Sequence, residues 1–512
     1  MADREASVGE IPFIKGEDLP KVPLVLNGVS SRFIQENRVV PIEFKNNVLK
    51  VAMADPEDTE TIDALQVALA AAVVVFAVDP HAVNEYLARF YGQDSQNMNR
   101  IIEDLGGGIE FLREEEEDIG HLKDLAAEAP IIKLVNLIIS RAVESRASDI
   151  HIEPFEDELK VRYRIDGVLH DIEPIPKKLQ AAIVSRIKLM AKLNIAERRL
   201  PQDGRIRLKV SEREIDLRVS TIPVLFGESV VMRILKKEGI VIDLELLGFP
   251  PDTLTSFNAL INKPNGIILV TGPTGSGKTT TLYGALDKIN SPDRKIITVE
   301  DPVEYQLKGV NQIQVKPQIG LNFANTLRHI VRQDPDIIMI GEIRDLETAE
   351  IAIQSALTGH LVFSTLHTND APSAITRLLD MGVENFLLSS TVRGILAQRL
   401  VRVIDPACKE VDPDPPGREE LLSLGIGKDV PVHRGRGCET CAHTGYFGRL
   451  GIYELLVVED AMRKMILTNA DSNEIRQTAR ASGMRTLLED GAQKIRQGVT
   501  TLSEVLRVTQ EF

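Results

Sequence analysis

The run at residues 272–279, GPTGSGKT, carries the residue types best suited to chemistry in this sequence. It has the spacing G-x-x-x-x-G-K-T, with an apolar predicted strand at residues 267–270 before it and a predicted helix after it. Glycines let backbone N–H groups converge on phosphate oxygens, and the helix N-terminus adds its positive end. We expect Lys278 to reach the β- and γ-phosphates and Thr279 to hold Mg²⁺. The predicted nucleotide-binding residues are Gly272, Pro273, Thr274, Gly275, Ser276, Gly277, Lys278, Thr279 and Thr280.

Carboxylates follow two further apolar segments, and hydrolysis of a bound nucleotide would need a carboxylate near the attacking water. DPDIIMIGE (residues 334–342) predicts a strand that ends near Glu342, and a strand parallel to the one before the glycine-rich loop would place Glu342 beside the metal. Residues 296–299 predict another strand, followed by Glu300 and Glu304, either of which can orient a water and accept its proton. A plain buried strand with a polar end and an acidic turn around Pro302 are the structural alternatives.

Two histidines bracket a fourth apolar strand, predicted at residues 361–366. His360 precedes this strand and His367 follows it. Histidines at the ends of a core strand can sense the γ-phosphate or hold the Glu342 loop, and a purely structural role is the alternative. Both are therefore candidate site residues.

Composition limits what else the chain can be. Its 512 residues suggest three or four domains, and its net charge of −15 disfavours a general nucleic-acid binder, which needs cationic surface. Much of that charge lies in two loops, at residues 109–118 and 410–420. Three cysteines are too few for a disulfide framework and indicate a reducing compartment. The longest apolar run, residues 67–78, is too short for a membrane span of about 20 residues and predicts a short helix followed by a buried strand.

The elements that must position these residues are predicted from the periodicity of apolar residues. They indicate an α/β protein with several domains. An N-terminal α/β module (residues 1–108) is expected to dock or regulate, and an acidic linker (109–122) follows it. An arginine-rich α/β domain with a hairpin at Asp166-Gly167 occupies residues 123–240. The predicted nucleotide-binding core spans residues 241–404, a cysteine segment spans 405–450 and a helical C-terminus spans 451–512.

Several motifs in one order make the chain similar to a known family. TVEDPVE, DPDIIMIGEIRD and TGHLVFSTLHTND follow the glycine-rich loop, VRYRIDG, PQDGR and DLRVST precede it, and GCETCAHTGY comes later. Together they resemble the secretion and traffic ATPases of bacterial type II secretion and type IV pilus assembly. The resemblance covers roughly residues 125–512, and its ending LRVTQEF favours the type II secretion branch over pilus extension.

This resemblance implies an ATP- and Mg²⁺-dependent hydrolase with a RecA-like core preceded by a PAS-like domain. It also implies a homohexamer that meets inner-membrane platform proteins through residues 1–108, so that a cytoplasmic chain lies peripherally on that membrane. Arg205 and Arg218 are the first candidates for arginine fingers, with Arg164 and Arg233 as second choices. Glu342 would join the Mg²⁺ shell, while Glu300 or Glu304 would position the water. A nucleic-acid motor and a non-hydrolysing scaffold are the alternatives from other functional classes, and no nucleic-acid partner is expected.

The resemblance also implies a zinc knuckle, from which this chain departs at one position. Family members carry two C-x-x-C pairs, and Cys438 and Cys441 form the second. In the first pair Cys408 is present, but Asp405 stands where the other cysteine would be. Carboxylate oxygen is an acceptable zinc ligand. We therefore expect a zinc site of three cysteines and Asp405, with a metal-free knuckle as the alternative.

Overall fold

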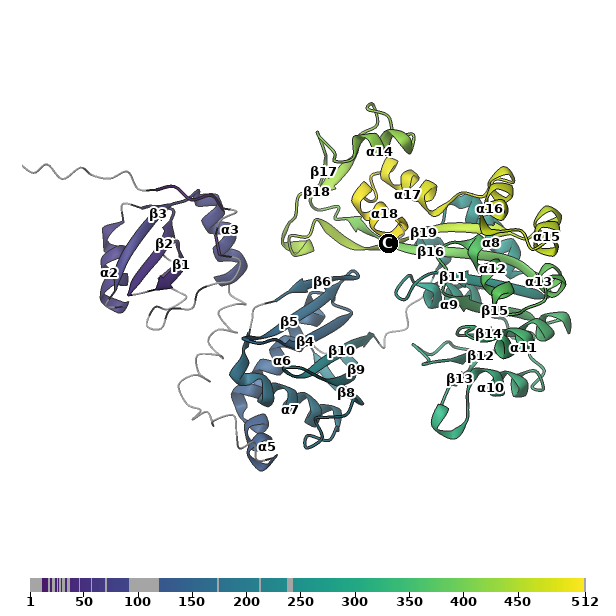
Figure 1. Ribbon diagram of the computed structural model, residues 1–512, viewed down its shortest axis with the longest axis horizontal. Helices are drawn as coiled ribbons and strands as arrows, with labels where there is room; N and C mark the ends of the chain where they lie inside the picture. Colours follow the sequence, from purple (N-terminus) through teal and green to yellow (C-terminus); the bar gives the residue numbers. More distant parts are fainter. Residues whose placement is uncertain are drawn as a thin grey trace, which may run out of the picture. The chain divides into compact units, whose positions relative to one another are not determined.

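The computed structural model describes residues 12–91, 119–236 and 243–510, with short gaps in the first two ranges (Figure 1). The chain forms two compact units, Met1–Lys236 and Lys237–Phe512. The first unit contains a small N-terminal module and a larger α/β domain. No helix in the described ranges is long and apolar enough to cross a membrane.

In its described residues, the N-terminal module contains a three-stranded sheet and the helices α2 and α3. Its elements are β1 (Val39–Lys45), β2 (Val48–Met53), α2 (Thr59–Leu69), β3 (Ala72–Ala77) and α3 (Pro80–Tyr91). The Asp58 carboxylate accepts a hydrogen bond from Thr61 N at 3.1 Å and so caps α2. The strand expected to be buried is β3, and this expectation is wrong, because β3 ends the strand order β1-β2-β3 and leaves Val74 41% exposed.

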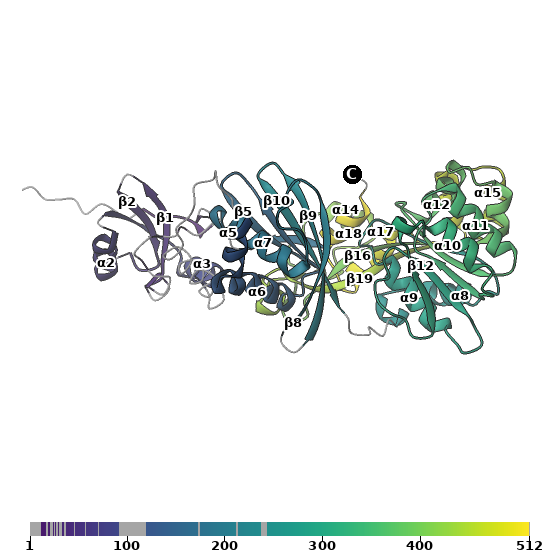
Figure 2. The same cartoon turned by 90° about the horizontal axis from the view of Figure 1, so that it is seen from below.

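The larger domain of the first unit is a seven-stranded antiparallel sheet with helices on one face (Figure 2). Its strand order is β6-β5-β4-β10-β9-β8, and β7 pairs with β5. The strands are β4 (Asp149–Pro154), β5 (Glu158–Ile165), β6 (Val168–Asp171), β7 (Ile175–Pro176), β8 (Gln202–Val210), β9 (Arg213–Val224) and β10 (Gly227–Lys236). The helices are α5 (Ile119–Ala127), α6 (Ala129–Glu144) and α7 (Gln180–Ala191).

Two predictions about this domain have different outcomes. The hairpin at Asp166-Gly167 joins β5 to β6, and both turn residues have positive φ, 48° and 87°. The predicted end of the acidic linker at residue 122 instead falls inside α5, which begins at Ile119. The rest of that linker, residues 109–118, lies outside the described residues.

The second unit is built on a seven-stranded sheet of order β13-β12-β14-β15-β11-β16-β19, parallel except for β19. Its strands are β11 (Gly266–Thr271), β12 (Ile296–Glu300), β13 (Val310–Gln314), β14 (Ile337–Ile340), β15 (Leu361–Leu366), β16 (Val392–Ile404) and β19 (Tyr446–Val457). Both faces are covered, so the central strands are continuous apolar runs. On β11, Ile267 and Leu269 pack into one core, while Ile268 and Val270 pack into the other.

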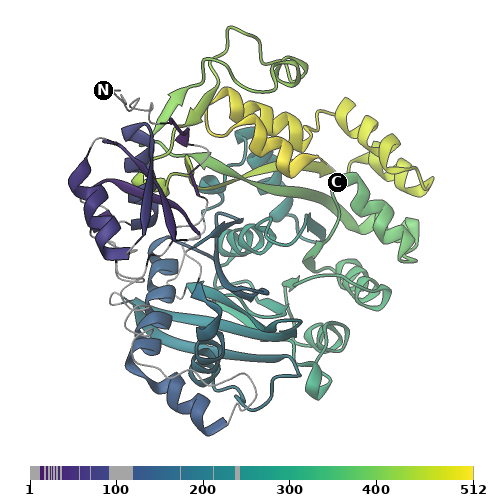
Figure 3. The ribbon, with the colours of Figure 1, turned by 60° about the vertical axis from the view of Figure 1, so that its left-hand side comes forward.

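The two faces of this sheet carry different helices. On one face lie α8 (Pro251–Ile261) and α9 (Lys278–Ile289). The opposite face carries α10 (Phe323–Ile330), α11 (Leu346–Leu357), α12 (Ala371–Asp380), α13 (Asn385–Thr391), α15 (Asp460–Leu467), α16 (Ser472–Ala481), α17 (Leu487–Arg496) and α18 (Leu502–Thr509). In Figure 3 the C-terminal helices lie along β16 and β19.

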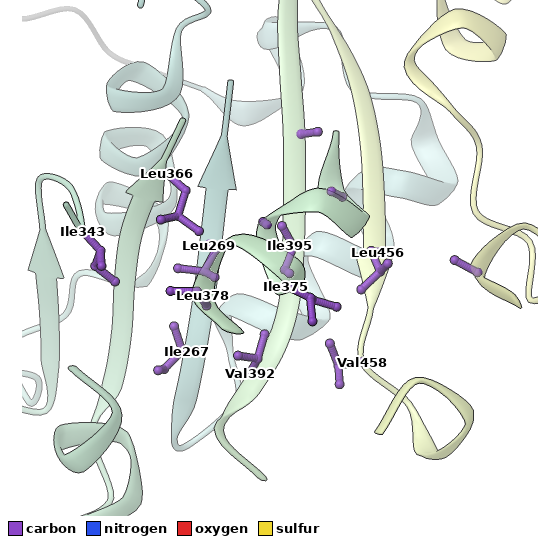
Figure 4. Close-up of a cluster of buried hydrophobic side chains, with 14 of the residues drawn as sticks. Ile267, Leu269, Ile343, Leu366, Ile375, Leu378, Val392, Ile395, Leu456 and Val458 are labelled. Atoms are coloured by element: carbon purple, nitrogen blue, oxygen red, sulfur yellow. The ribbon is translucent and has the colours of Figure 1, made fainter. Parts of the chain in front are cut away.

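The C-terminal helices are part of the core rather than a separate layer. Ile495 of α17 and Val505 of α18 belong to the same apolar cluster as Leu269 and Ile395 of the central sheet, the centre of which is drawn in Figure 4. The predicted boundary at residues 450/451 also falls inside β19. The cysteine segment is therefore an insertion between two paired strands, with its own β17 (Lys409–Val411), α14 (Arg418–Ser423) and β18 (His433–Gly435).

Candidate active site

The glycine-rich loop joins β11 to α9, as the sequence predicts. Gly277 caps α9 with φ 87°, and a Cβ built there would lie 2.8 Å from Nε2 of Gln398. Glycine is required here by both the positive φ and the close neighbour. The Lys278 amine donates to the carbonyl oxygens of Gly272 at 2.7 Å and Pro273 at 3.0 Å, so it is folded back into the loop.

Lys278 is almost fully buried, and this burial changes the pKa of its amine. The pKa of Lys278 is lowered to about 8, mainly by burial; the charge of Glu342 opposes this shift, and the charge of Arg399 contributes to it. The Ser276 hydroxyl is also buried, and it has no hydrogen-bond partner in the described part of the chain. A poorly solvated amine and an unsatisfied hydroxyl in one loop suit a polyanionic ligand.

Glu342 and His367 meet at the carboxyl ends of β14 and β15. These strands are parallel neighbours, with Ile340 opposite Ser364. Oε2 of Glu342 lies 3.5 Å from Nε2 of His367, and its other oxygen pairs with Arg344. Burial, followed by the charge of Lys278, lowers the pKa of His367. The structure thus brings three of the predicted groups, Lys278, Glu342 and His367, to one edge of the sheet.

His360 does not join them, and here the sequence-based expectation is wrong. Its carbonyl oxygen accepts from Gly266 N at the start of β11, whereas the glycine-rich loop follows the other end of that strand. Its ring Nδ1 lies 2.8 Å from the carbonyl oxygen of Ser355 and 3.1 Å from Oγ1 of Thr358. A whole strand separates the two histidines, and His360 closes the turn after α11.

Glu300 and Glu304 have different environments. Glu300 is 2% exposed and accepts hydrogen bonds from Tyr283 Oη, Thr298 Oγ1 and Gln312 Nε2. Burial and the adjacent Glu300 raise the pKa of Tyr283. Glu304 lies beyond the end of β12 with its side chain exposed to solvent. Glu300 is thus held inside the sheet by structural partners, while Glu304 is accessible.

Two polar residues of β16 that sequence reasoning missed support the loop from the side. Gln398 Oε1 accepts from Thr281 Oγ1 at 2.7 Å, and the buried Arg399 donates to the carbonyl oxygens of Gln398 at 3.0 Å and Asn369 at 2.7 Å. Both are nearly fully buried. Their sequence signal was a polar pair inside LAQRL, an otherwise apolar stretch, because buried polar residues are uncommon without a function.

Comparisons with known proteins identify the family of this chain. A family model described as type II/IV secretion system protein matches residues 124–507, and an MshEN domain model matches residues 10–97. The type II secretion system protein E of Xanthomonas campestris is 55% identical over 499 residues, or 97% of this chain and 87% of that protein. This chain belongs to the type II/IV secretion system protein family.

Other family members widen the comparison. The type IV pilus assembly ATPase PilB of Myxococcus xanthus is 44% identical over 501 residues, or 97% of this chain and 88% of that protein. The solved structure of the pilus retraction motor PilT with bound ADP has a TM-score of 0.50 at 30% identity and covers 73% of this chain and 96% of that one. The ATPase DotB of Yersinia pseudotuberculosis shares the fold, with a TM-score of 0.57 at 20% identity, covering 78% and 97%. This type II/IV secretion family member is an ATP hydrolase with a P-loop NTPase core, which confirms the predicted family, fold class and reaction.

The four candidate arginine fingers of the arginine-rich domain (residues 123–240) lie in one row across the sheet, in which each residue is paired with its neighbour on the next strand. Arg205 on β8, Arg218 on β9 and Arg233 on β10 are directly opposite one another, and the row continues through Asp149 on β4 to Arg164 on β5. Directly opposite residues of an antiparallel sheet share a face. One face of the sheet therefore presents all four arginines.

Pairing divides these arginines into two groups. Asp149 accepts from Nε of Arg233 at 2.9 Å and lies 3.8 Å from Nε of Arg164. Arg205 and Arg218 form no ion pair within the described residues of this domain, and both side chains are exposed. Of the four arginines, the two first choices are thus the two that no carboxylate among the described residues of the domain neutralises.

The three cysteines and Asp405 form one compact cluster. Their ligand atoms lie within 4.8 Å of one another. Sγ of Cys441 lies 3.9 Å from that of Cys408 and 3.7 Å from that of Cys438, and Sγ of Cys438 lies 3.1 Å from Asp405 Oδ2. Tetrahedral Zn–S bonds of about 2.3 Å place sulfur atoms about 3.8 Å apart, so the sulfur spacings fit zinc. Backbone N–H groups of Cys438 and Gly445 donate to Cys441, and such bonds hold the pKa of this thiol below its usual value despite burial.

Proposed function

We propose that this protein hydrolyses ATP to power protein export by a type II secretion system. The convergence of Lys278, Glu342 and His367 beside the glycine-rich loop carries the proposal, because it supplies phosphate binding and metal ligation at one edge of the sheet. The 55% identity to a type II secretion system protein E supports the cargo class. The 44% identity to a pilus assembly ATPase keeps pilus extension as the second candidate.

ATP and Mg²⁺ fit the residues present. The buried Ser276 hydroxyl and the Lys278 amine offer donors to phosphate, while Thr279 and Glu342 offer the oxygen ligands that Mg²⁺ prefers. The metal, when bound, supplies positive charge to the phosphoryl oxygens. Glu304 orients the attacking water and accepts its proton, since Glu300 is occupied by three structural donors.

Arg205 and Arg218 supply the cationic charge that stabilises the transferring phosphoryl group. Their lack of a carboxylate partner within the described domain supports this role, because a neutralised guanidinium contributes less to a developing negative charge. The assembly is a homohexamer, as the family resemblance implies. It docks on inner-membrane platform proteins through residues 1–108 and so lies on the cytoplasmic side of that membrane. Cys408, Cys438, Cys441 and Asp405 hold a structural zinc ion.

Deletion of the gene in its own host tests the cargo class. The deletion strain is complemented with the wild type or with Lys278→Ala, and immunoblots check that both accumulate equally. We expect the wild type alone to restore exoprotein in the culture medium, with surface pili unchanged throughout. Loss of pili with normal exoprotein release would reject secretion and support pilus extension.

A further inference from the structure

The second unit contains a cavity of about 1120 Å³ that the proposed function does not use. It lies among the start of the glycine-rich loop, β16, β19 and the C-terminal helices α16 and α17, elements that Figure 1 shows grouped together. Pro273, Asp370, Arg399, Glu454 and Arg496 are among its lining residues. Pockets of several hundred cubic ångströms hold small organic ligands, so this volume is sufficient for one.

Arginine dominates the charge of the cavity wall. The five lining arginines are Arg399, Arg476, Arg480, Arg496 and Arg507. Three of them are neutralised by ion pairs of 2.6–2.7 Å, formed by Arg476 with Asp370, Arg480 with Glu489 and Arg507 with Glu504. The remaining two arginines determine the charge that a ligand would meet.

Arg399 and Arg496 are oriented by backbone carbonyls instead of carboxylates. Arg496 donates to the carbonyl oxygen of Leu424 at 2.8 Å, and Arg399 is held by Gln398 and Asn369. Neither forms an ion pair with any residue in the described part of the chain. A guanidinium group has five N–H donors and stays charged, so the N–H groups of Arg399 and Arg496 that do not bond these carbonyls remain for a ligand.

Glu454 is the one lining carboxylate outside these ion pairs, and burial weakens its charge. Its Oε1 accepts from Ala371 N at 2.8 Å, and burial raises its pKa to about 7. Near neutral pH, Glu454 is therefore only partly ionised. The wall keeps a net positive charge from two pre-oriented guanidinium groups.

We propose that this cavity is a second anion site, distinct from the glycine-rich loop, that binds a small phosphate-bearing molecule. Guanidinium groups match phosphate oxygens with paired N–H donors and stay charged at all physiological pH values. The occupant carries a terminal phosphate, whether inorganic phosphate released by hydrolysis or a phosphorylated metabolite.

Arg399 links this site to the nucleotide site. A Cβ built on Gly272, the first residue of the glycine-rich loop, would lie 3.0 Å from Nη1 of Arg399. A bound anion that neutralises Arg399 changes the positive charge beside the glycine-rich loop. Phosphate in the cavity and nucleotide in the loop therefore influence each other's affinity, and such coupling is reciprocal.

The test is isothermal titration of the full chain with saturating Mg²⁺–ADP, which fills the glycine-rich loop. Inorganic phosphate is titrated in one arm and a nucleoside monophosphate in another, so that the arm with the tighter binding identifies the source. We expect Arg496→Gln to weaken binding at least tenfold. The matched control Arg434→Gln changes an exposed arginine of β18 that pairs with Glu410 outside the cavity, and it should bind as the wild type does.

The outcomes separate this site from the loop. Lys278→Ala, titrated without ADP, should still bind the probe, since its cavity is intact. Absence of binding to the ADP-saturated wild type in both arms would overturn the proposal, as would equal binding by Arg496→Gln. Binding to the wild type only in the absence of ADP, together with no binding to Lys278→Ala, would assign the anion to the glycine-rich loop and reject the cavity site. If Arg496→Gln fails to fold, as judged by its melting curve, Arg399→Gln serves as the second cavity variant with the same expectation, because Arg399 is the other lining arginine without an ion pair in the described residues.

Discussion

His367 Nε2 lies 3.5 Å from Glu342 Oε2, at the carboxyl ends of two adjacent parallel strands. Because the pKa of His367 is lowered, its ring is mainly neutral near pH 7 and the contact is a hydrogen bond. The histidine therefore orients the carboxylate without neutralising it. This leaves the negative charge of Glu342 for a metal ion.

Removal of either main charge of the site should stop turnover. Lys278→Ala removes the amine that contacts phosphate and is expected to abolish hydrolysis, and Glu342→Ala should nearly abolish it through loss of the Mg²⁺ shell. Steady-state phosphate release measures both. Lys288→Ala, a half-exposed lysine in the last turn of the same helix, should retain activity. Full hydrolysis by either site variant would reject these roles.

The two acidic candidates should respond differently to substitution. Glu304→Gln is expected to lower kcat by about 100-fold or more with little change in KM, because it removes a proton acceptor. Glu300→Gln places an amide against donors and should lower stability by about 1–3 kcal/mol. Kinetics and thermal melting of both variants distinguish the roles. A kcat loss confined to Glu300→Gln in a stable protein would reverse the assignment.

Substitution of an arginine on the face of the sheet that carries the candidate arginine fingers should lower kcat only where the arginine has no carboxylate partner among the described residues of the domain. Arg205→Ala and Arg218→Ala are each expected to reduce kcat by about 100-fold or more while nucleotide affinity stays constant, since their charge acts on the transition state. Arg207→Ala is the matched control, because Arg207 lies on the same strand and face and is tied to Asp216 at 3.6 Å. Equal losses in all three variants would show a general charge effect instead.

The cysteine cluster should contain metal. Protein purified without chelator is expected to carry about one zinc ion per chain by elemental analysis. Cys441→Ser should lose it and lower the melting temperature, whereas Asp405→Cys should bind zinc more tightly through a fourth thiolate. A zinc content near zero in the wild type would leave a metal-free knuckle.

Glu454 should give the stability of the second unit a distinct pH dependence. Its folded-state pKa of about 7 exceeds the ordinary value of 4.5, so the folded state binds the extra proton between these pH values. Stability therefore falls as pH rises from about 4.5 to about 7 and stays lower above it. Glu454→Gln should remove this slope and raise stability at pH 8 by up to about 3 kcal/mol. Melting temperatures at pH 5 and pH 8 measure the difference, and an unchanged slope in the variant would contradict the prediction.

Local spacing was sufficient to predict much of this protein. The glycine-rich loop and the hairpin at Asp166-Gly167 each depend on residues a few positions apart. Chain order in a parallel sheet was enough to predict Glu342 and His367 at one edge, because successive carboxyl ends meet there. For the same reason, the placement of His360 in the site was an avoidable error, since it precedes its strand.

Tertiary structure alone decided which candidates are accessible and which are paired. The burial of Glu300 comes from Tyr283 and Gln312 on other elements, and the register that aligns Arg205 with Arg218 comes from strand pairing. The approach of Arg399 to the glycine-rich loop follows from β16 packing beside β11, more than a hundred residues away in sequence. Periodicity shows which face of an element is apolar, but not which distant side chain will cover it. Those contacts exist only once the sheet has assembled.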